Sequence, residues 1–409
     1  MVKPMARFEH GGDVYTHADA VDFSANINPL GMPQVARDAI VAHMEAFEAY
    51  PDSECRELRR AIARVEGTSY EHIVCTAGAS DLFQRICNVL RPRLALVTAP
   101  CFSGYEEALE QAGAHIVRHA LREDDDFGVT ESLLRFTRRD LGTRSVSPNA
   151  SDVASGERNG SSMLELGAGP RGVTAAGTPA EQSAGTAASS AATRASVDES
   201  GVPDMLFLCN PNNPTGLTLD RGLLERVLDE ARGAGVTVVL DECFLDFTGE
   251  PSAVELCSDH PNLIIARAFT KMYAMAGLRV GYGICSDEEL VVRLAGAGQP
   301  WAVSGPAQVA ATAALADSDW VQRTRCYVDE QRELLAGGLR ECGMRVIPGR
   351  ANYLLFQSGR ALYEPLLQRG FLIRRCGNFQ GLDESWYRIA VRTATENEAF
   401  LRALREVCA

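Results

Sequence analysis

The sequence predicts an α/β fold, with a large domain built on a mostly parallel sheet and a second, smaller α+β domain. From about residue 22 to 140, and again from about 202 to 284, short β-branched or apolar runs alternate with segments of helical period. Alternation of this kind is typical of parallel sheets covered by helices. After Trp320 the pattern changes to one long helical segment followed by short strands, which indicates the second domain.

Each expected element follows from one of these runs. The strands expected in the large sheet are His72–Cys75, Leu94–Thr98, Met205–Cys209, Val236–Leu240, Leu263–Ala266 and Val280–Ile284, and the helices expected between them are Glu54–Val65, Asp81–Leu90, Tyr105–Gln111 and Arg221–Arg232. In the smaller domain we expect a helix from Trp320 to about Gly343, strands Tyr353–Phe356, Leu372–Arg375 and Tyr387–Val391, and a last helix from about Glu396. Because ligands of such folds bind at the carboxyl ends of strands, the loops after these strands are the expected place of a site.

The domain organisation expected from these elements has three parts. Residues 1–45 form an N-terminal segment that packs with the small domain, residues 46–299 form the large domain, and residues 300–409 form the small one. Residues 141–200 interrupt the large domain, because 36 of these 60 residues are Ala, Gly, Ser or Thr and too little apolar surface is left to bury. We expect a disordered insertion there; an Ala-rich helix is the alternative.

Composition excludes several classes of protein. A chain of 409 residues with 46% apolar residues is long enough to bury a large core without disulfides. The net charge of −14 disfavours a nucleic-acid partner, and no run of residues is long and apolar enough for a membrane span. The twelve cysteines form no CxxC pair, so we expect neither a metal site nor a disulfide framework. The start of the chain shows no apolar signal core, which favours a cytoplasmic location.

The chain contains only two lysines among its 40 basic residues. Lys3 lies in the N-terminal tail, where a solvated charge is the expected role. Lys271 lies within a run of apolar and small residues, 268–277, and is therefore a candidate amine nucleophile.

Three further polar or charged residues accompany Lys271 along the chain, and together the four supply the groups that one cofactor needs. Asn213 lies in the turn 210–216 after a strand, Asp241 ends the next strand, and Arg279 follows Lys271 by eight residues. Pyridoxal phosphate chemistry needs a lysine for the Schiff base, a carboxylate that keeps the ring nitrogen protonated, an amide near the ring oxygen and a cation for the phosphate. Taken singly, Asn213 is equally explained by a tight turn and Asp241 by a helix cap.

These motifs resemble the fold-type-I pyridoxal-phosphate enzymes of the class I/II aminotransferase superfamily. The resemblance rests on the runs 210–216, 240–242, 269–271 and 276–282, and it extends over nearly the whole chain except residues 141–200. It implies pyridoxal 5′-phosphate as cofactor, with Lys271 and Asp241 as catalytic residues. It also implies a homodimer with shared active sites.

The resemblance implies further cofactor contacts. Backbone N–H groups at a helix N-terminus would bind the phosphate, an aromatic ring would stack on the pyridine, a hydroxyl would assist at the phosphate, and a tyrosine would reach the phosphate in the neighbouring subunit. The residues at these positions are, in that order, Gly78, Ala79 and Ser80; Phe102; Thr270; and Tyr50. For Phe102 and Tyr50, ordinary core packing is the alternative.

A narrower resemblance concerns the substrate. The segments 10–12, 22–31, 371–379 and 387–397 are similar to threonine-phosphate decarboxylases, which are close relatives of the histidinol-phosphate aminotransferases. Phe244 agrees with this, because aminotransferases of this group usually place a tyrosine there. Ala268 and Arg375 depart from the pattern: a serine is common at the first position and an acidic residue at the second. Candidate substrate-binding residues are His10, Asn28, Arg374 and Arg388, of which the two arginines suit carboxylate and phosphate groups.

We therefore expect a lyase that converts L-threonine O-3-phosphate to (R)-1-amino-2-propanol O-2-phosphate in cobalamin biosynthesis. The first alternative is an aminotransferase for histidinol phosphate or a similar amine. A non-catalytic protein of the same fold is the second, and the presence of both Lys271 and Asp241 speaks against it.

Overall fold

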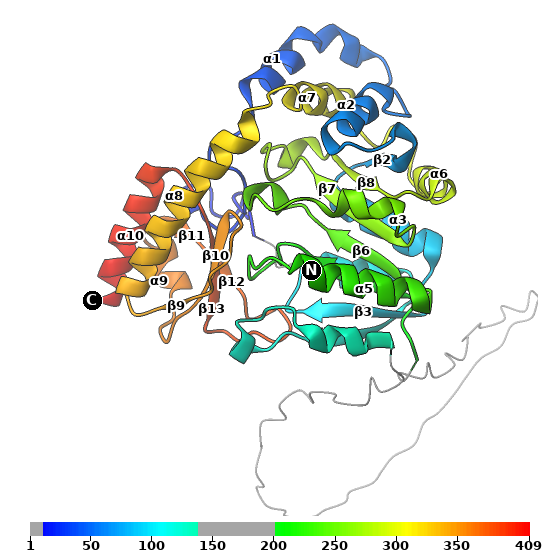
Figure 1. The fold of residues 1–409 in the computed structure, drawn as a ribbon. Helices are drawn as coiled ribbons and strands as arrows, with labels where there is room; N and C mark the ends of the chain where they lie inside the picture. Colours follow the sequence, from blue (N-terminus) through cyan, green and yellow to red (C-terminus); the bar gives the residue numbers. More distant parts are fainter. Residues whose placement is uncertain (1–10, 138–200) are drawn as a thin grey trace, which may run out of the picture. The chain divides into compact units, whose positions relative to one another are not determined.

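A seven-stranded mixed sheet is the centre of the computed structural model, which describes residues 11–137 and 201–409 (Figure 1). Its strand order is β2-β8-β7-β6-β5-β3-β4; β8 runs antiparallel to both of its neighbours and the other pairs are parallel. The strands are β2 (Ile73–Thr76), β3 (Leu94–Ala99), β4 (His115–Ala120), β5 (Met205–Cys209), β6 (Thr237–Asp241), β7 (Leu263–Ala268) and β8 (Gly281–Ile284). The predicted α/β class and mostly parallel sheet are confirmed.

Helices cover both faces of this sheet, because successive side chains of a strand point to opposite faces. In β6, Val239 belongs to one apolar core, whereas Val238 and Leu240 belong to the other. Residues of α3 (Ala79–Leu90), α4 (Gly104–Gln111) and α6 (Glu288–Gly296) complete the core around Val239. The opposite core includes residues of α2 (Arg56–Glu66) and α5 (Arg221–Ala234).

A four-stranded antiparallel sheet with order β12-β13-β10-β9 forms the C-terminal part of the described residues. Its strands are β9 (Arg345–Val346), β10 (Tyr353–Gln357), β12 (Arg374–Arg375) and β13 (Trp386–Ala390), and the helices beside it are α8 (Trp320–Glu341), α9 (Tyr363–Leu367) and α10 (Ala394–Cys408). A capping box between Thr393 and Glu396 fixes the start of α10. The predicted long helix and last helix are confirmed, and the predicted strand Leu372–Arg375 is divided between β12 and β11 (Phe371–Leu372).

The N-terminal segment is joined to this C-terminal part. Strand β1 (Val21–Asp22) pairs in parallel with β11, and the ring of Phe23 stacks on Phe400 of α10 at a centroid distance of 4.7 Å. Helix α1 (Gln34–Ala42) contacts α7 (Gly305–Ala314) instead. The described residues belong to one compact unit, so the predicted boundaries at residues 45 and 299 stay a prediction.

Several elements differ from the sequence expectation for identifiable reasons. The sequence analysis did not foresee β4, whose polar residues reflect its place at the edge of the sheet. It also missed α7, which is rich in alanine and shows little amphipathic pattern. Short 3-10 helices lie at 44–48, 70–72, 123–125, 131–137, 245–247, 253–258 and 276–278. The predicted insertion 141–200 lies outside the described residues. In the part of the chain that the structure describes, no helix has the length and apolar character of a membrane crossing.

The contact between Phe23 and Phe400 gives a stability prediction. Phe400 is fully buried and also meets the ring of Phe371 edge-on at 5.7 Å. Phe400→Ala should lower the free energy of unfolding by about 3–5 kcal/mol, because it leaves a cavity between the first and last parts of the chain. Urea unfolding followed by circular dichroism measures this. Val292→Ala, at an exposed position of α6, is the control and should change it by less than about 0.5 kcal/mol; equal losses for both variants would contradict the packing argument.

Candidate active site

A cavity of about 330 Å³ opens where the carboxyl ends of the central strands meet. Asp241 is the last residue of β6, and Lys271 follows the end of β7 by three residues. Both side chains line this cavity. The two groups on which the cofactor prediction depends are therefore in one place, although the sequence separates them by thirty residues.

Most of the other predicted site residues line the same cavity. Those found in its wall are Ala79, Ser80, Phe102, Asn213, Asp241, Thr270, Lys271, Arg279, Arg374 and Arg388. Parallel strands explain this gathering, because the loops after β3, β5, β6 and β7 all leave the same edge of the sheet.

Lys271 is half-buried, and its amine lies where surrounding side chains exclude water. Burial lowers the pKa of its amine to about 8, and the charges of Arg388 and Arg279 act in the same direction. The Nζ atom lies 5.6 Å from the centre of the Phe244 ring. A lowered pKa increases the neutral fraction of the amine near neutral pH, which is the nucleophilic form.

Asp241 is buried beneath the cavity with both carboxylate oxygens bonded. Tyr105 donates its hydroxyl to Oδ2 at 2.6 Å, and the Cys243 backbone N–H donates to Oδ1 at 2.9 Å. Burial raises the pKa of Asp241, whereas the hydrogen bonds from Cys243 and Tyr105 oppose that rise. The bonds thus stabilise an anion in a place where desolvation disfavours one.

The opposite end of the cavity is suited to an anion. Helix α3 begins after Gly78, whose φ of +95° favours glycine, and the next two residues, Ala79 and Ser80, line the cavity. The guanidinium of Arg279 donates to the carbonyl oxygens of Ala77 at 3.2 Å and Ala276 at 3.1 Å, which fixes it beside this helix start. A Cβ atom at Gly281 would lie 3.0 Å from the Ala79 nitrogen, so the backbone comes close only because glycine is there.

Two arginines line the side of the cavity formed by the smaller sheet. Arg374 and Arg388 are cross-strand partners in β12 and β13, and both are buried. Arg388 donates to the Asn213 side-chain oxygen and, at 3.1 Å, to the Ser24 carbonyl oxygen, while Arg374 donates to Asn378 at 2.9 Å. The neighbouring Arg375 is exposed, with its guanidinium 4.4 Å from the centre of the Tyr363 ring. Two buried cations on one wall suit a ligand with two anionic groups.

Among the described residues, three predicted ones are not in the cavity wall: Asn28, Tyr50 and Gly78, which directly precedes Ala79. Asn28 is buried, and its amide donates to the Met272 carbonyl oxygen at 2.6 Å and to Thr324 at 3.0 Å. These bonds hold the loop that carries Lys271. They give no support to the predicted contact between Asn28 and the substrate. Tyr50 is 79% exposed and stacks on Trp301. His10 lies outside the described residues.

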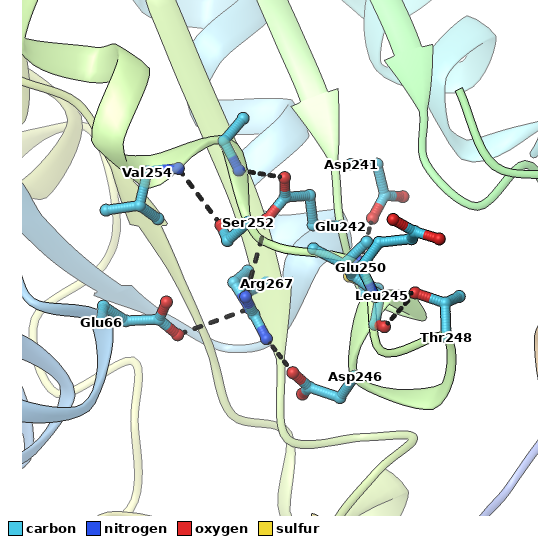
Figure 2. A network of polar contacts seen from close by, with 12 residues as sticks. Glu66, Asp241, Glu242, Leu245, Asp246, Thr248, Glu250, Ser252, Val254 and Arg267 are labelled. Atoms are coloured by element: carbon cyan, nitrogen blue, oxygen red, sulfur yellow. Dashed lines mark hydrogen bonds and ion pairs between the residues drawn. The ribbon is translucent and has the colours of Figure 1, made fainter. Parts of the chain in front are cut away.

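A buried charge network lies behind the cavity, and Figure 2 shows it from close by. Arg267 of β7 lies 3.5 Å from the Glu66 carboxylate and 3.6 Å from that of Glu242, and it also pairs with Asp246. Glu242 accepts hydrogen bonds from the Ser252 hydroxyl at 2.5 Å and from the Ala253 N–H at 2.9 Å. One guanidinium thus serves three carboxylates. Burial raises the pKa of Glu242 to about 7, although the charge of Arg267 lowers it.

Sequence analysis missed several residues that build this site. Tyr105 was assigned only to a helix, and Arg267 and Asn26 were not singled out. Tyr105 follows Phe102 by three residues, in the segment directly after an expected strand. This nearness to a predicted cofactor contact is a sequence signal that points to Tyr105. Asn26 is buried, lines the cavity, and its Oδ1 atom accepts no hydrogen bond from the described residues; nothing in its sequence context distinguishes it from Asn28.

Known proteins show the same organisation. The model of the family "Aminotransferase class I and II" matches residues 18–135 and 172–404. Threonine-phosphate decarboxylase of Salmonella typhimurium is 32% identical over 97% of this chain and 96% of that protein. Histidinol-phosphate aminotransferase 2 of Archaeoglobus fulgidus is 30% identical over 95% and 93% of the two chains. The crystal structure of histidinol-phosphate aminotransferase from Clostridium acetobutylicum superposes with a TM-score of 0.75 at 26% identity, over 94% of this chain and 98% of that one.

The fold and the lysine–aspartate site define a pyridoxal-phosphate enzyme of fold type I. Within that class, the chain belongs to the aminotransferase class I and II family, as the sequence resemblance predicts. Family membership confirms pyridoxal 5′-phosphate as the cofactor. The residues present fit it: the cavity joins an anion-binding end at Arg279 to a buried carboxylate at Asp241, with the amine of Lys271 in the same wall.

The charge network predicts a pH-dependent stability. A raised pKa means that native Glu242 binds more protons than the unfolded chain between pH 4.5 and about 7, so its contribution to stability falls as the pH rises through that range. Glu242→Gln mimics the protonated form and does not titrate. Its free energy of unfolding, relative to the unchanged protein, should therefore increase from pH 4.5 to 7 by up to about 3 kcal/mol.

Denaturant unfolding at several pH values measures this difference. Glu398→Gln, at an exposed position of α10, is the matched control for loss of one carboxylate. A difference for Glu242→Gln that stays constant from pH 4.5 to 7 would show that the pKa of Glu242 is the same in the folded and unfolded chain, which contradicts the raised pKa.

Proposed function

We propose that this chain decarboxylates L-threonine O-3-phosphate and releases carbon dioxide and (R)-1-amino-2-propanol O-2-phosphate, as a step in cobalamin biosynthesis. The observation that carries the proposal is the pair Arg374 and Arg388, two buried guanidinium groups in the wall of the cavity that holds Lys271. A substrate with both a carboxylate and a phosphate matches two such cations. The similarity to the threonine-phosphate decarboxylase of Salmonella typhimurium supports the same substrate.

The proposed roles follow from position. When bound, pyridoxal phosphate withdraws electrons from the α-carbon of an amine substrate. The amine of Lys271 would hold the cofactor at its aldehyde, and once a substrate amine has displaced it, the freed amine can accept or return a proton. Asp241 would pair with the ring nitrogen, and Ala79, Ser80, Thr270 and Arg279 would bind the cofactor phosphate. Arg374 and Arg388 hold the substrate anions, and the angle at which they hold the carboxylate decides whether it or the α-proton is lost.

Phe244 favours decarboxylation. Its ring lies in the cavity wall near the Nζ atom of Lys271, where related aminotransferases usually carry a tyrosine. Phenylalanine offers no hydroxyl donor at this place, which agrees with the narrower sequence resemblance.

The second candidate function is transamination of histidinol phosphate or a similar amine. It is favoured by the similarity to the histidinol-phosphate aminotransferases of Archaeoglobus fulgidus and Clostridium acetobutylicum. The same anion sites would then bind a substrate that carries a phosphate but no carboxylate.

We further propose that the protein is a homodimer in which Tyr50 reaches the cofactor phosphate of the partner subunit. Tyr50 does not line the cavity of its own chain, and it is exposed together with Val41 and Met44 of the same region. Several exposed apolar side chains within one short segment are typical of a protein interface.

A product assay tests the function. The purified protein loaded with pyridoxal phosphate should release carbon dioxide and the aminopropanol phosphate from L-threonine O-3-phosphate. Lys271→Ala should lose this activity by a factor of about 10⁴ or more, because the amine both binds the cofactor and moves protons. Turnover of histidinol phosphate that depends on 2-oxoglutarate, without carbon dioxide release, would instead establish the aminotransferase.

Sedimentation velocity tests the dimer. We expect a single dimeric species, and Tyr50→Phe should weaken binding of pyridoxal phosphate about tenfold through the lost hydroxyl. The shared site would be contradicted if the protein sediments as a monomer and if the unchanged protein and Tyr50→Phe bind the cofactor equally tightly.

A further inference from the structure

Tyr105 is the hydroxyl that contacts the buried aspartate of the site. It lies at the start of α4 with 1% of its surface exposed, and its hydroxyl donates to Asp241 Oδ2 at 2.6 Å. Aromatic neighbours fix its ring: Phe207 stacks on it at 5.1 Å, and Phe83 and Phe102 meet it edge-on at 5.0 and 5.6 Å. The hydroxyl therefore has little freedom to leave the carboxylate.

The groups around Asp241 come from several different elements. Tyr105 belongs to α4, and Cys243 belongs to the loop after β6 and donates its backbone N–H to Oδ1. The other titratable groups close enough to influence it are the Cys243 thiol itself, Cys209 of β5, Lys271 after β7 and Tyr353 of β10. The Cys209 thiol is directed to the Pro211 carbonyl oxygen at 3.2 Å, so it already has an acceptor.

This arrangement opposes a specific tendency of buried carboxylates. Desolvation favours the neutral acid, and a neutral acid cannot balance the charge of a protonated pyridine nitrogen. A hydrogen bond to a charged group is stronger than one between neutral groups, so a hydroxyl donor favours the ionised carboxylate. Burial and the nearby carboxylate raise the pKa of Tyr105 well above its ordinary value, so the hydroxyl keeps its proton and stays a donor.

We propose that Tyr105 is a positioning residue that acts on the cofactor through Asp241. Its hydroxyl keeps the carboxylate ionised and oriented, and thereby keeps the ring nitrogen of pyridoxal phosphate protonated. This inference rests on the proposed role of Asp241 and does not depend on which substrate the enzyme uses.

Tyr105→Phe removes the hydroxyl and retains the ring that packs against Phe207. The variant and the unchanged protein are loaded with pyridoxal phosphate labelled with ¹⁵N in the ring, and the nitrogen shift is followed against pH without substrate. In the variant the ring nitrogen should lose its proton at a lower pH than in the unchanged protein. Cofactor affinity should fall about tenfold, and kcat should fall by a similar factor with KM nearly unchanged.

Tyr387→Phe is the matched control. Tyr387 is buried in the smaller sheet, where its hydroxyl accepts a hydrogen bond from the Leu362 N–H at 3.3 Å. Loss of that hydroxyl should leave the nitrogen shift unchanged at every pH. A second variant carries 3-fluorotyrosine at position 105, which keeps the shape of the side chain and makes its hydroxyl a stronger donor. It should move the titration of the ring nitrogen in the direction opposite to Tyr105→Phe. This variant keeps the proposal testable if Tyr105→Phe does not fold.

Two negative results have different meanings. Equal nitrogen titrations and equal cofactor affinities for the unchanged protein and both position-105 variants would overturn the role of Tyr105 and leave the proposed function intact. Failure of the unchanged protein to bind the cofactor through Lys271 would overturn the proposed site roles and this inference together.

Discussion

The structure depends on holding the carboxylate of Asp241 and the amine of Lys271 together out of water. Charges in such a place are costly unless neighbouring groups stabilise them, and desolvation shifts the pKa of each toward its neutral form. At Asp241 the surrounding residues oppose the shift and favour the charged carboxylate. At Lys271 the neighbouring cations add to the shift and favour the neutral amine. Tyr105 and Cys243 donate hydrogen bonds to the carboxylate, whereas the cations Arg388 and Arg279 disfavour a charged amine. The result is an anion and a nucleophile in one cavity.

A second set of charges holds the strands that carry these two groups. Arg267 lies in β7, four residues before Lys271, and Glu242 follows Asp241 directly. Their contact therefore ties the ends of two adjacent strands behind the cavity, and Glu66 extends the tie to the end of α2 (Figure 2). A buried network of this kind fixes geometry only while its hydrogen bonds are satisfied, and the donors from Ser252 and Ala253 meet that need at Glu242.

Sequence could predict the fold and the core of the site because both are encoded locally. Apolar runs such as Met205–Cys209 define strands, and Asp241 and Lys271 stand at strand ends where a parallel sheet brings them together. The partners of these residues could not be predicted in the same way. Tyr105 precedes Asp241 by more than a hundred residues, and its bond depends on which face of the sheet α4 covers. Asn28 shows the converse: it lies in a recognisable motif, but its side chain is used to hold the loop of Lys271.

The pairing of β1 with β11 has a consequence for biosynthesis. Ser24, Ala25 and Asn26 line the cavity immediately after β1, and β1 pairs with a strand near the other end of the chain. During translation the first of these segments leaves the ribosome long before its partner exists. The cofactor pocket is therefore completed only after the segment that carries β11 has been synthesised, and a nascent chain that ends before β11 would possess the central sheet without a closed wall around the lysine.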